Sequence, residues 1–301
     1  MRTIAFGYST RCNLKCTHCV AAGDQKPVKM VLERAKELIG QLAKAQVGGV
    51  SFTAGEPLLY LDDLARLIEL CHIHQIYSRV VTNSFWGKSQ EQADQYVQRL
   101  QKSGLCQLRL SFSRWHQEHV PRQNVLRVAR SCEAHGLDYF ISFVTDFSLE
   151  DDSFESYLRA HDLTFFPEPV IFSGRAKGFK RVPLRTDYQA NCCPMNPYLA
   201  PTGDVYACCD AGSHFMATNF FHLGNTTQDS VGDLFELSEQ NRLYNHIRTM
   251  GISTLASFAG FKSRDIIRYR KCELCEKMFN SPSVLAMLQR EAETGLRDWY
   301  R

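Results

Sequence analysis

Short apolar runs alternate with amphipathic runs up to about residue 175, and this rhythm restricts the fold more than any other feature. We predict strands at 4–8, 49–53, 78–82, 107–112, 139–145 and 169–172. Helical patterns lie between them at 30–46, 62–75, 89–103, 121–136 and 151–160. Repeated strand–helix alternation indicates a parallel sheet with helices outside it. Six such units predict an α/β fold built as an open, partial barrel.

The unusual residues of this half follow the predicted strands. Three cysteines come after the first strand, an Ala-Gly-Glu-Pro turn after the second and an asparagine after the third, and two serines flank the end of the fourth. They are Cys12, Cys16, Cys19, Ala54, Gly55, Glu56, Asn83, Ser111 and Ser113. Because function in such a fold lies at the carboxyl ends of the strands, we predict one site that contains them all.

The first three cysteines, Cys12, Cys16 and Cys19, have the spacing C-x3-C-x2-C. Three thiolates can hold three irons of a cubane cluster, since soft sulfur ligands suit iron–sulfur clusters. Without a fourth cysteine nearby, one iron stays open for a small molecule. The alternatives are a zinc knuckle or buried free thiols. Zinc usually takes four ligands, and the only nearby addition, His18, would form a cramped chelate beside Cys19. The spacing therefore favours a [4Fe-4S] cluster with an open iron.

Composition limits the possible partners. Twelve cysteines among 301 residues lie in tight clusters, which favours metal binding over a disulfide framework. A balance of 35 basic against 32 acidic residues gives no sign of a nucleic-acid partner. The N-terminus carries no secretory signal, and no apolar run is long enough to span a membrane. We therefore expect a cytoplasmic protein, where thiolate ligands stay reduced, with no membrane partner.

A second group of cysteines begins after about residue 185, where the strand–helix rhythm ends. It comprises Cys192, Cys193, Cys208, Cys209, Cys272 and Cys275. Four thiolates, those of Cys193, Cys208, Cys272 and Cys275, could fully ligate a second four-iron cluster. A structural zinc site needs the same four thiolates, so both alternatives stay open. Between and after the cysteines we predict helical stretches at 231–250 and 283–300.

The cysteine loop and the Ala-Gly-Glu-Pro turn together resemble the radical S-adenosylmethionine (SAM) superfamily over residues 1–185. This resemblance implies a partial (β/α)6 TIM barrel in which the open iron is chelated by the amino and carboxylate groups of SAM. It also implies that backbone groups of Ala54, Gly55 and Glu56 bind the SAM amine. Ala54 replaces the first glycine of the family's Gly-Gly-Glu-Pro run, which we expect to be tolerated with a negative φ.

Further SAM contacts follow from the same resemblance. Asn83 would lie near the ribose, and Ser111 and Ser113 would reach the ribose or the carboxylate. Arg175 could pair with the carboxylate through a bidentate contact, although a solvated arginine would fit the sequence equally well.

The tail, residues 186–301, resembles the SPASM/twitch extensions of peptide-modifying radical SAM enzymes. Cys193, Gly203 and Cys208 have the spacing C-x9-G-x4-C, and Cys272-x2-Cys275 follows. The resemblance implies a smaller cysteine-rich domain with one auxiliary [4Fe-4S] cluster.

Three short runs, at 83–87, 203–209 and 279–281, are more specifically similar to the epipeptide epimerases. In those enzymes an adenosyl radical abstracts the Cα hydrogen from a residue of a ribosomally made peptide. A cysteine then returns hydrogen to the opposite face, which converts an L-residue to a D-residue. The matching cysteine is Cys209, which we predict to be catalytic. The implied partners are a precursor peptide and a reductant such as flavodoxin or ferredoxin.

Two other functions fit the same residues. An enzyme that forms a thioether or carbon–carbon crosslink on a peptide would use the same SAM chemistry and leave Cys209 dispensable. A non-catalytic, zinc-containing peptide-binding protein would use the cysteines without SAM. Because the cysteine loop begins at residue 12, we expect no leader-binding module before it. The barrel, the tail or a separate protein would then hold the peptide.

Overall fold

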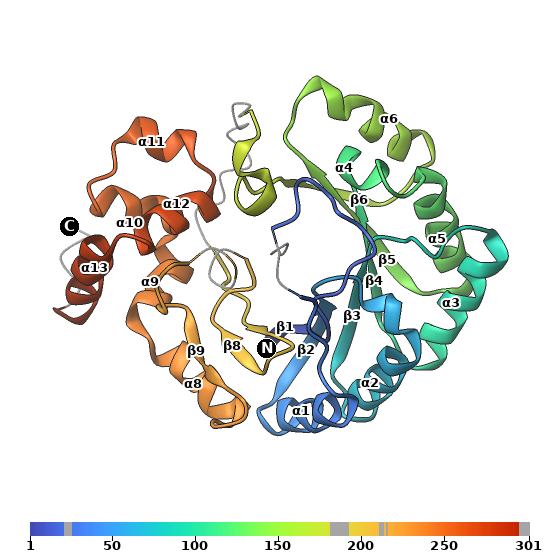
Figure 1. The fold of residues 1–301 in the computed structure, drawn as a ribbon, viewed down its shortest axis with the longest axis horizontal. Coiled ribbons are helices and arrows are strands. Elements are labelled where there is room, and N and C mark those ends of the chain that lie inside the picture. The colour runs from blue at the N-terminus through green and yellow to red at the C-terminus, as the bar shows by residue number, and fades with distance from the viewer. Residues whose placement is uncertain (21–25, 181–192, 211–213, 215, 295–301) are drawn as a thin grey trace.

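The computed structural model of the chain describes residues 1–20, 26–180, 193–210, 214 and 216–294. Its centre is a nine-stranded sheet in the order β6-β5-β4-β3-β2-β1-β7-β8-β9 (Figure 1). The first six strands are parallel and follow one another in sequence order, which confirms the predicted α/β fold. They are β1 (Arg2–Gly7), β2 (Val47–Thr53), β3 (Tyr77–Thr82), β4 (Gln107–Phe112), β5 (Asp138–Thr145) and β6 (Phe165–Pro169).

Helices connect these strands and cover the outer face of the curved sheet (Figure 1). The connecting helices are α1 (Leu32–Lys44), α2 (Leu61–Ile73), α3 (Gln90–Lys102), α5 (Arg122–His135) and α6 (Asp152–Ala160). Four short helices follow the carboxyl ends of strands: η1 (Pro57–Tyr60), α4 (Arg114–Gln117), η2 (Leu149–Asp151) and η3 (Gly174–Gly178). Local chemistry defines the ends of the longer ones. The Ser89 hydroxyl accepts a hydrogen bond from the Gln92 N–H at 3.1 Å to begin α3, and Gly136 ends α5 with φ +69°.

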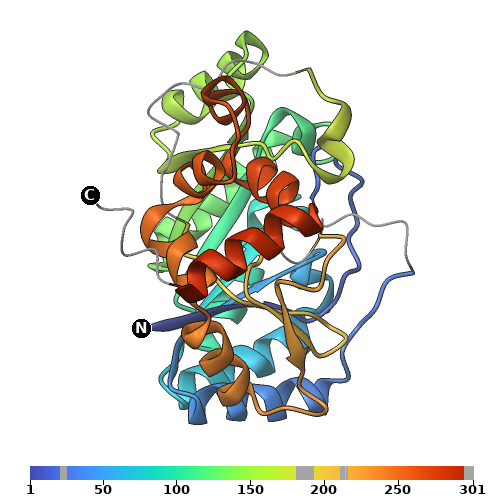
Figure 2. The same cartoon turned by 90° about the vertical axis from the view of Figure 1, so that its left-hand side faces the viewer.

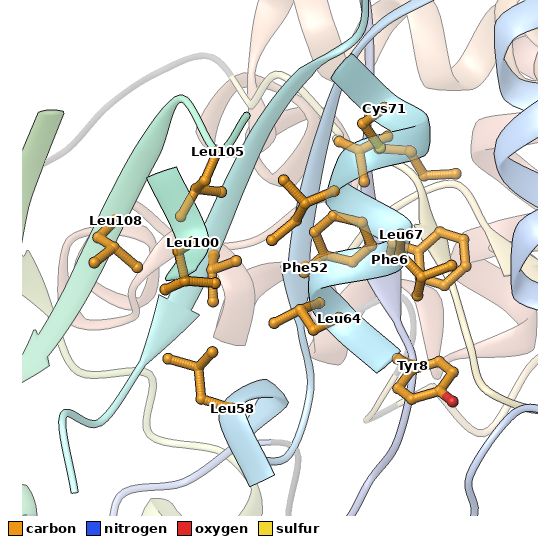
Figure 3. Packing of buried hydrophobic residues seen from close by; sticks show 14 of the residues in the cluster. Phe6, Tyr8, Phe52, Leu58, Leu64, Leu67, Cys71, Leu100, Leu105 and Leu108 are labelled. Carbon is orange, nitrogen blue, oxygen red and sulfur yellow. The ribbon is translucent and has the colours of Figure 1, made fainter. Parts of the chain in front are cut away.

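The main core lies between the sheet and its outer helices. Phe6 and Phe52 are paired neighbours on β1 and β2 with ring centroids 5.6 Å apart. They pack against Leu64 and Leu67 of α2, as Figure 3 shows. Each fully buried side chain of this kind contributes about 1.5–3 kcal/mol to folding. Because strand residues alternate between faces, the neighbouring side chains face the inside of the partial barrel, and these are only half-buried on β4.

Two sequence predictions in this region were wrong in detail. The sixth strand lies at Phe165–Pro169 instead of at 169–172. The sequence Phe-Phe-Pro-Glu-Pro looks unfavourable for a strand because proline donates no hydrogen bond, but β6 is an edge strand, where proline is tolerated. The predicted helix at 231–250 is divided into two helices at Asn241, whose side chain caps the second by accepting a hydrogen bond from the Tyr244 N–H at 3.0 Å.

The tail continues the same sheet. Strand β7 (Tyr198–Leu199) runs parallel to β1, and β8 (Asp204–Tyr206) and β9 (His222–Asn225) add an antiparallel pair. Six helices follow: α8 (Val231–Gln240), α9 (Arg242–Met250), α10 (Ile252–Phe258), α11 (Ser263–Arg268), α12 (Lys271–Phe279) and α13 (Pro282–Thr294). Figure 2 shows these helices, in orange and red, in front of the sheet. The predicted helix at 283–300 is thus described as far as residue 294, and residues 295–301 lie outside the described part.

The tail also contacts the opposite side of the partial barrel. The Ser173 hydroxyl, in the segment after β6, donates a hydrogen bond to the Glu276 carboxylate of α12 at 2.5 Å. Arg270, at the start of the same helix, donates to the carbonyl of Val170. The tail therefore meets the core at both β1 and the end of β6. A domain boundary at residue 185 stays a prediction, and it falls within residues 181–192, outside the described part.

Among the described residues, the longest and most apolar helices are too short or too polar to cross a membrane.

Candidate functional site

The cysteine loop follows β1 directly. The Cys19 N–H donates to the Cys16 carbonyl at 3.2 Å, and the Leu14 N–H points at Cys12 Sγ at 3.4 Å. Burial, with smaller contributions from the nearby thiols of Cys19 and Cys12, raises the pKa of Cys16 to about 12. Three thiolates held this close need a cation to neutralise them. Three soft sulfur donors in one loop fit an iron cluster.

The three thiols differ in their exposure. Cys12 is exposed, Cys19 is half-buried and Cys16 is buried. The loop therefore has an outer edge at Cys12 that faces solvent and an inner edge at Cys16 that faces protein.

Arg175, predicted to bind the SAM carboxylate, lies against this loop. Its Nη1 donates to the Cys16 carbonyl at 2.9 Å, and its backbone N–H donates to the Cys19 carbonyl at 3.4 Å. Arg175 thus connects η3, which follows β6, to the cysteine loop, which follows β1. Its contact with SAM stays a prediction.

The turn after β2 corrects one expectation. Ala54 has φ +66°, not the negative value that we expected, and Gly55 follows with φ +57°. A Cβ on Gly55 would lie 2.2 Å from the Arg11 carbonyl oxygen, so only glycine fits there. This close approach allows a hydrogen bond between the turn and the cysteine loop, because the Glu56 N–H donates to the same Arg11 carbonyl at 2.8 Å. The positive φ of Ala54 is a strained conformation for a residue with a side chain, and it allows the turn to lie against the cysteine loop.

Glu56 uses its carboxylate inside the protein. Oε1 accepts hydrogen bonds from the Leu58 N–H at 3.1 Å and the Thr82 hydroxyl at 2.9 Å. Oε2 accepts from the Asn83 N–H at 2.8 Å. The side chain is 1% exposed, and burial raises its pKa to about 7 although these three donors lower it. The carboxylate therefore joins the ends of β2 and β3. The predicted contact between SAM and the backbone of Glu56 stays a prediction.

Asn83 contacts the cysteine loop, and its predicted place near the SAM ribose stays a prediction. Its Nδ2 donates to Asn13 Oδ1 at 2.9 Å and lies 3.9 Å from Cys12 Sγ. Its Oδ1 accepts from the Phe85 N–H at 3.0 Å. The structure thus brings the end of β3 against the outer edge of the loop.

The two serines of β4 have different surroundings. The buried Ser113 begins α4: its hydroxyl accepts from the His116 N–H at 3.1 Å and lies 2.8 Å from His116 Nδ1. The Ser113 hydroxyl therefore bonds within its own helix start. Ser111 is half-buried on the inner face of β4, in register with Ser142 of β5. Ser111 and Ser142 both face the inside of the barrel, and the SAM contacts predicted for Ser111 and Ser113 stay predictions.

Sequence reasoning missed an aromatic stack that supports the cysteine loop. Trp115 lies between His18, at 5.0 Å between ring centroids, and Phe179, at 5.5 Å. Arg114 lies over the Trp115 ring at 4.3 Å and pairs with the buried carboxylates of Asp146 and Asp151, each at 2.7 Å. The run Ser-Arg-Trp-His after a strand was the available signal, because a tryptophan in a loop usually packs against something.

Four cysteines of the second group lie around one cavity, and their role as cluster ligands stays a prediction. Cys193, Cys208, Cys272 and Cys275 all line one small cavity in the tail, together with Lys271 and apolar side chains. Cys208 follows β8, and Cys272 and Cys275 are one turn apart on α12. Four soft sulfur donors around a shared space fit an iron–sulfur cluster. Within the described ranges, no set of three His, Cys, Asp or Glu side chains is placed to hold a single metal ion.

Cys209 does not line that cavity. It is half-buried, and burial raises the pKa of its thiol. Its thiol interacts electrostatically with Tyr198, whose ring lies where a Cβ on Gly7, at the end of β1, would be. The next residue, Asp210, interacts with Arg109 of β4. Cys209 is therefore at the junction of the tail and the core. Cys192, its counterpart beside Cys193, lies outside the described residues.

The fold, the cysteine loop and the turn after β2 define a class of protein. Residues 7–151 match the Radical SAM superfamily, and the chain carries a radical SAM domain. Members of this class use a [4Fe-4S] cluster and SAM, which agrees with the donors at Cys12, Cys16 and Cys19.

Two curated proteins are similar in sequence. YydG of Bacillus subtilis, a proposed peptide biosynthesis protein, is 22% identical over 222 residues, which is 69% of this chain and 69% of YydG. GTP 3′,8-cyclase of Mannheimia succiniciproducens is 28% identical over 104 residues, 33% of this chain and 29% of that protein.

Two solved structures show the same fold. BtrN, in complex with AdoMet and 2-DOIA, has a TM-score of 0.55 at 15% identity and aligns 84% of this chain with 89% of its own. SuiB of Streptococcus suis, bound to its precursor peptide SuiA, has a TM-score of 0.51 at 14% identity and aligns 91% of this chain with 75% of its own.

Proposed function

We propose that this protein is a radical SAM enzyme that modifies a ribosomally made peptide by converting one L-residue to a D-residue. The similarity to YydG, a proposed peptide biosynthesis protein, supports a peptide substrate. SuiB, which shares the fold, was solved with a precursor peptide bound. Inversion is the finer part of the proposal, and it depends on a cysteine.

The chain's own residues prepare the reaction. Cys12, Cys16 and Cys19 would hold the SAM-binding cluster, and the turn at Ala54 and Gly55 holds the cysteine loop in place. When bound there, the cluster and SAM would supply the radical chemistry that removes the Cα hydrogen of the bound residue. The barrel positions the peptide and excludes water.

The position of Cys209 carries the proposal. It is the cysteine of the Cys208–Cys209 pair that stays outside the four-thiol cavity. Its thiol interacts electrostatically with Tyr198 of β7, which lies beside Gly7 at the end of β1. A thiol at that junction would give its hydrogen atom to a planar carbon radical on the bound peptide, and inversion requires delivery to the face opposite the one that lost hydrogen. The S–H bond breaks and a C–H bond forms, leaving a sulfur radical that one electron and one proton must restore.

The tail would hold an auxiliary [4Fe-4S] cluster through Cys193, Cys208, Cys272 and Cys275. Cys208 is adjacent to Cys209, so this cluster lies close enough to return the electron. Soft thiolates also bind zinc, and the colour and iron content of an anaerobic preparation distinguish the two metals.

The test incubates candidate precursor peptides with the anaerobic enzyme, SAM and reductant in heavy water. Inversion places one deuterium at Cα of the altered residue with no other change in mass. A loss of two hydrogens would instead show crosslinking and contradict the proposal.

The Cys209→Ala variant tests the hydrogen donor. It should still release 5′-deoxyadenosine but yield no D-residue. The matched control is Cys132→Ala, a cysteine buried in the core on α5. Normal D-product from Cys209→Ala would remove the donor assignment.

A further inference from the structure

We propose that a hollow beside the outer edge of the cysteine loop is the docking site of an acidic one-electron carrier protein. The hollow has a volume of about 810 Å³. The proposal builds on the proposed function, because a cluster that cleaves SAM must receive an electron from outside.

The hollow adjoins the side of the loop that faces solvent. Asn13 and Leu14, directly after the exposed Cys12, form one wall. Phe85 and Lys88, after β3, and Arg127, on α5, form other walls. Electron transfer slows steeply with distance, so a donor gains most by contacting the loop where a cysteine ligand reaches the surface.

The charge around the hollow suits an acidic partner. Lys88 is exposed and Arg127 is half-buried, and neither forms an ion pair with any residue that the structure describes. Arg127 donates instead to the neutral carbonyls of Gly87 and Lys88, at 3.1 and 3.0 Å, so its positive charge remains uncompensated. Glu118 is the acidic residue of the lining. Complementary charge of this kind steers association and raises its rate.

Two further basic residues flank the ligand itself. Arg11 and Lys15 are both exposed on the cysteine loop, on either side of Cys12. Half-buried apolar side chains of the hollow, Leu14 and Phe85, provide contact area within this basic surround. An apolar centre with a charged rim is the usual anatomy of a protein–protein interface.

The hollow adjoins the expected SAM site at Asn13, which bonds to Asn83, but much of its lining lies outside the barrel interior. Arg127 and Gln123 belong to α5, a helix of the outer layer, whereas Ser111 and Ser142 face the inside of the barrel. A carrier protein seated in the hollow would therefore leave the interior open. One electron leaves the carrier, which is oxidised, and enters the cluster, which is reduced by one electron; no bond is made or broken.

The test compares Lys88→Glu with Lys102→Glu in the anaerobic holoprotein. The Lys102→Glu substitution is the control, because it makes the same charge change in the last turn of α3, before the amino end of β4. The probe is an acidic flavodoxin. Binding of its oxidised form is measured by calorimetry at two salt concentrations without turnover. Reduction of the cluster by its reduced form is followed by absorbance, with dithionite, which needs no docking surface, as the alternative reductant.

We expect Lys88→Glu to weaken flavodoxin binding about tenfold at low salt, to flatten its salt dependence and to slow reduction by flavodoxin. Reduction by dithionite and iron content should be unchanged, and Lys102→Glu should behave as the wild type. Equal binding by the two variants would overturn the proposal. Weaker binding of the precursor peptide with unchanged flavodoxin binding would also overturn it, and would assign the hollow to the peptide. No step uses peptide turnover, so failure of the epimerase proposal would not affect the result.

Discussion

Replacing Glu56 by glutamine tests the balance of forces behind the turn after β2. Burial opposes the charge of this carboxylate, whereas the donors at Leu58, Thr82 and Asn83 favour it. Burial dominates, since the pKa is raised from 4.5 to about 7. Glutamine copies the shape of the carboxyl group and stays neutral at every pH.

The magnitude follows from proton linkage. Because the folded pKa lies above the unfolded one, the folded state keeps its proton longer, and stability falls as pH rises from about 4.5 to 7. Integrated between pH 5 and pH 8, the loss is about 2–3 kcal/mol for the wild type and is absent in Glu56→Gln. The variant should therefore gain about that much relative to the wild type over this range, and most of the gain should be complete by pH 7.5.

Urea unfolding at several pH values measures the difference. Tryptophan fluorescence is a suitable signal, because Trp86 donates a hydrogen bond to Thr82 at 3.1 Å within the same network. Other titrating groups are common to both proteins and cancel in the difference. Parallel stability profiles would refute the reasoning, since they would mean that the three donors already keep Glu56 ionised at pH 5.

Three more predictions concern strain, buried charge and the second cluster. Ala54→Gly should raise the free energy of unfolding by about 0.5–1 kcal/mol by relieving positive φ, and a lower urea midpoint would contradict this. Arg114→Met should destabilise the protein by about 3–5 kcal/mol in the same assay, because two buried carboxylates lose their partner. Cys272→Ser should lose about half of the bound iron by colorimetric assay while Cys132→Ala keeps it all.

The sequence predicted the fold well where local and tertiary preferences agree. Strand β4 lies at the predicted positions, because alternating Leu108, Leu110 and Phe112 mark a buried face with period two. Prediction was wrong at β6, where two prolines are tolerated only because the strand has one neighbour. An edge position is a property of the whole sheet, and local composition does not reveal it.

The candidate site divides in the same way. Cysteine spacing predicted which thiols belong together, and in the structure four thiols of the second group line one cavity. The φ of Ala54 was predicted with the wrong sign, since it depends on how closely the turn approaches Arg11. The support that Trp115 gives to His18 was missed for a related reason: the two rings are 97 positions apart in sequence, Trp115 minus His18, and only the fold brings them together.

The order of residues alone therefore determined the chemistry available to this protein: soft ligands in two groups, at fixed spacings, on an α/β framework. Tertiary structure decided which functional side chains form hydrogen bonds inside the protein and which remain accessible to a ligand. Glu56 and Ser113 are occupied by hydrogen bonds, whereas Cys12 reaches solvent and Cys209 stays outside the four-thiol cavity. The reason is physical: spacing along a chain sets what neighbours can share, but burial and hydrogen bonding depend on segments that meet only after folding.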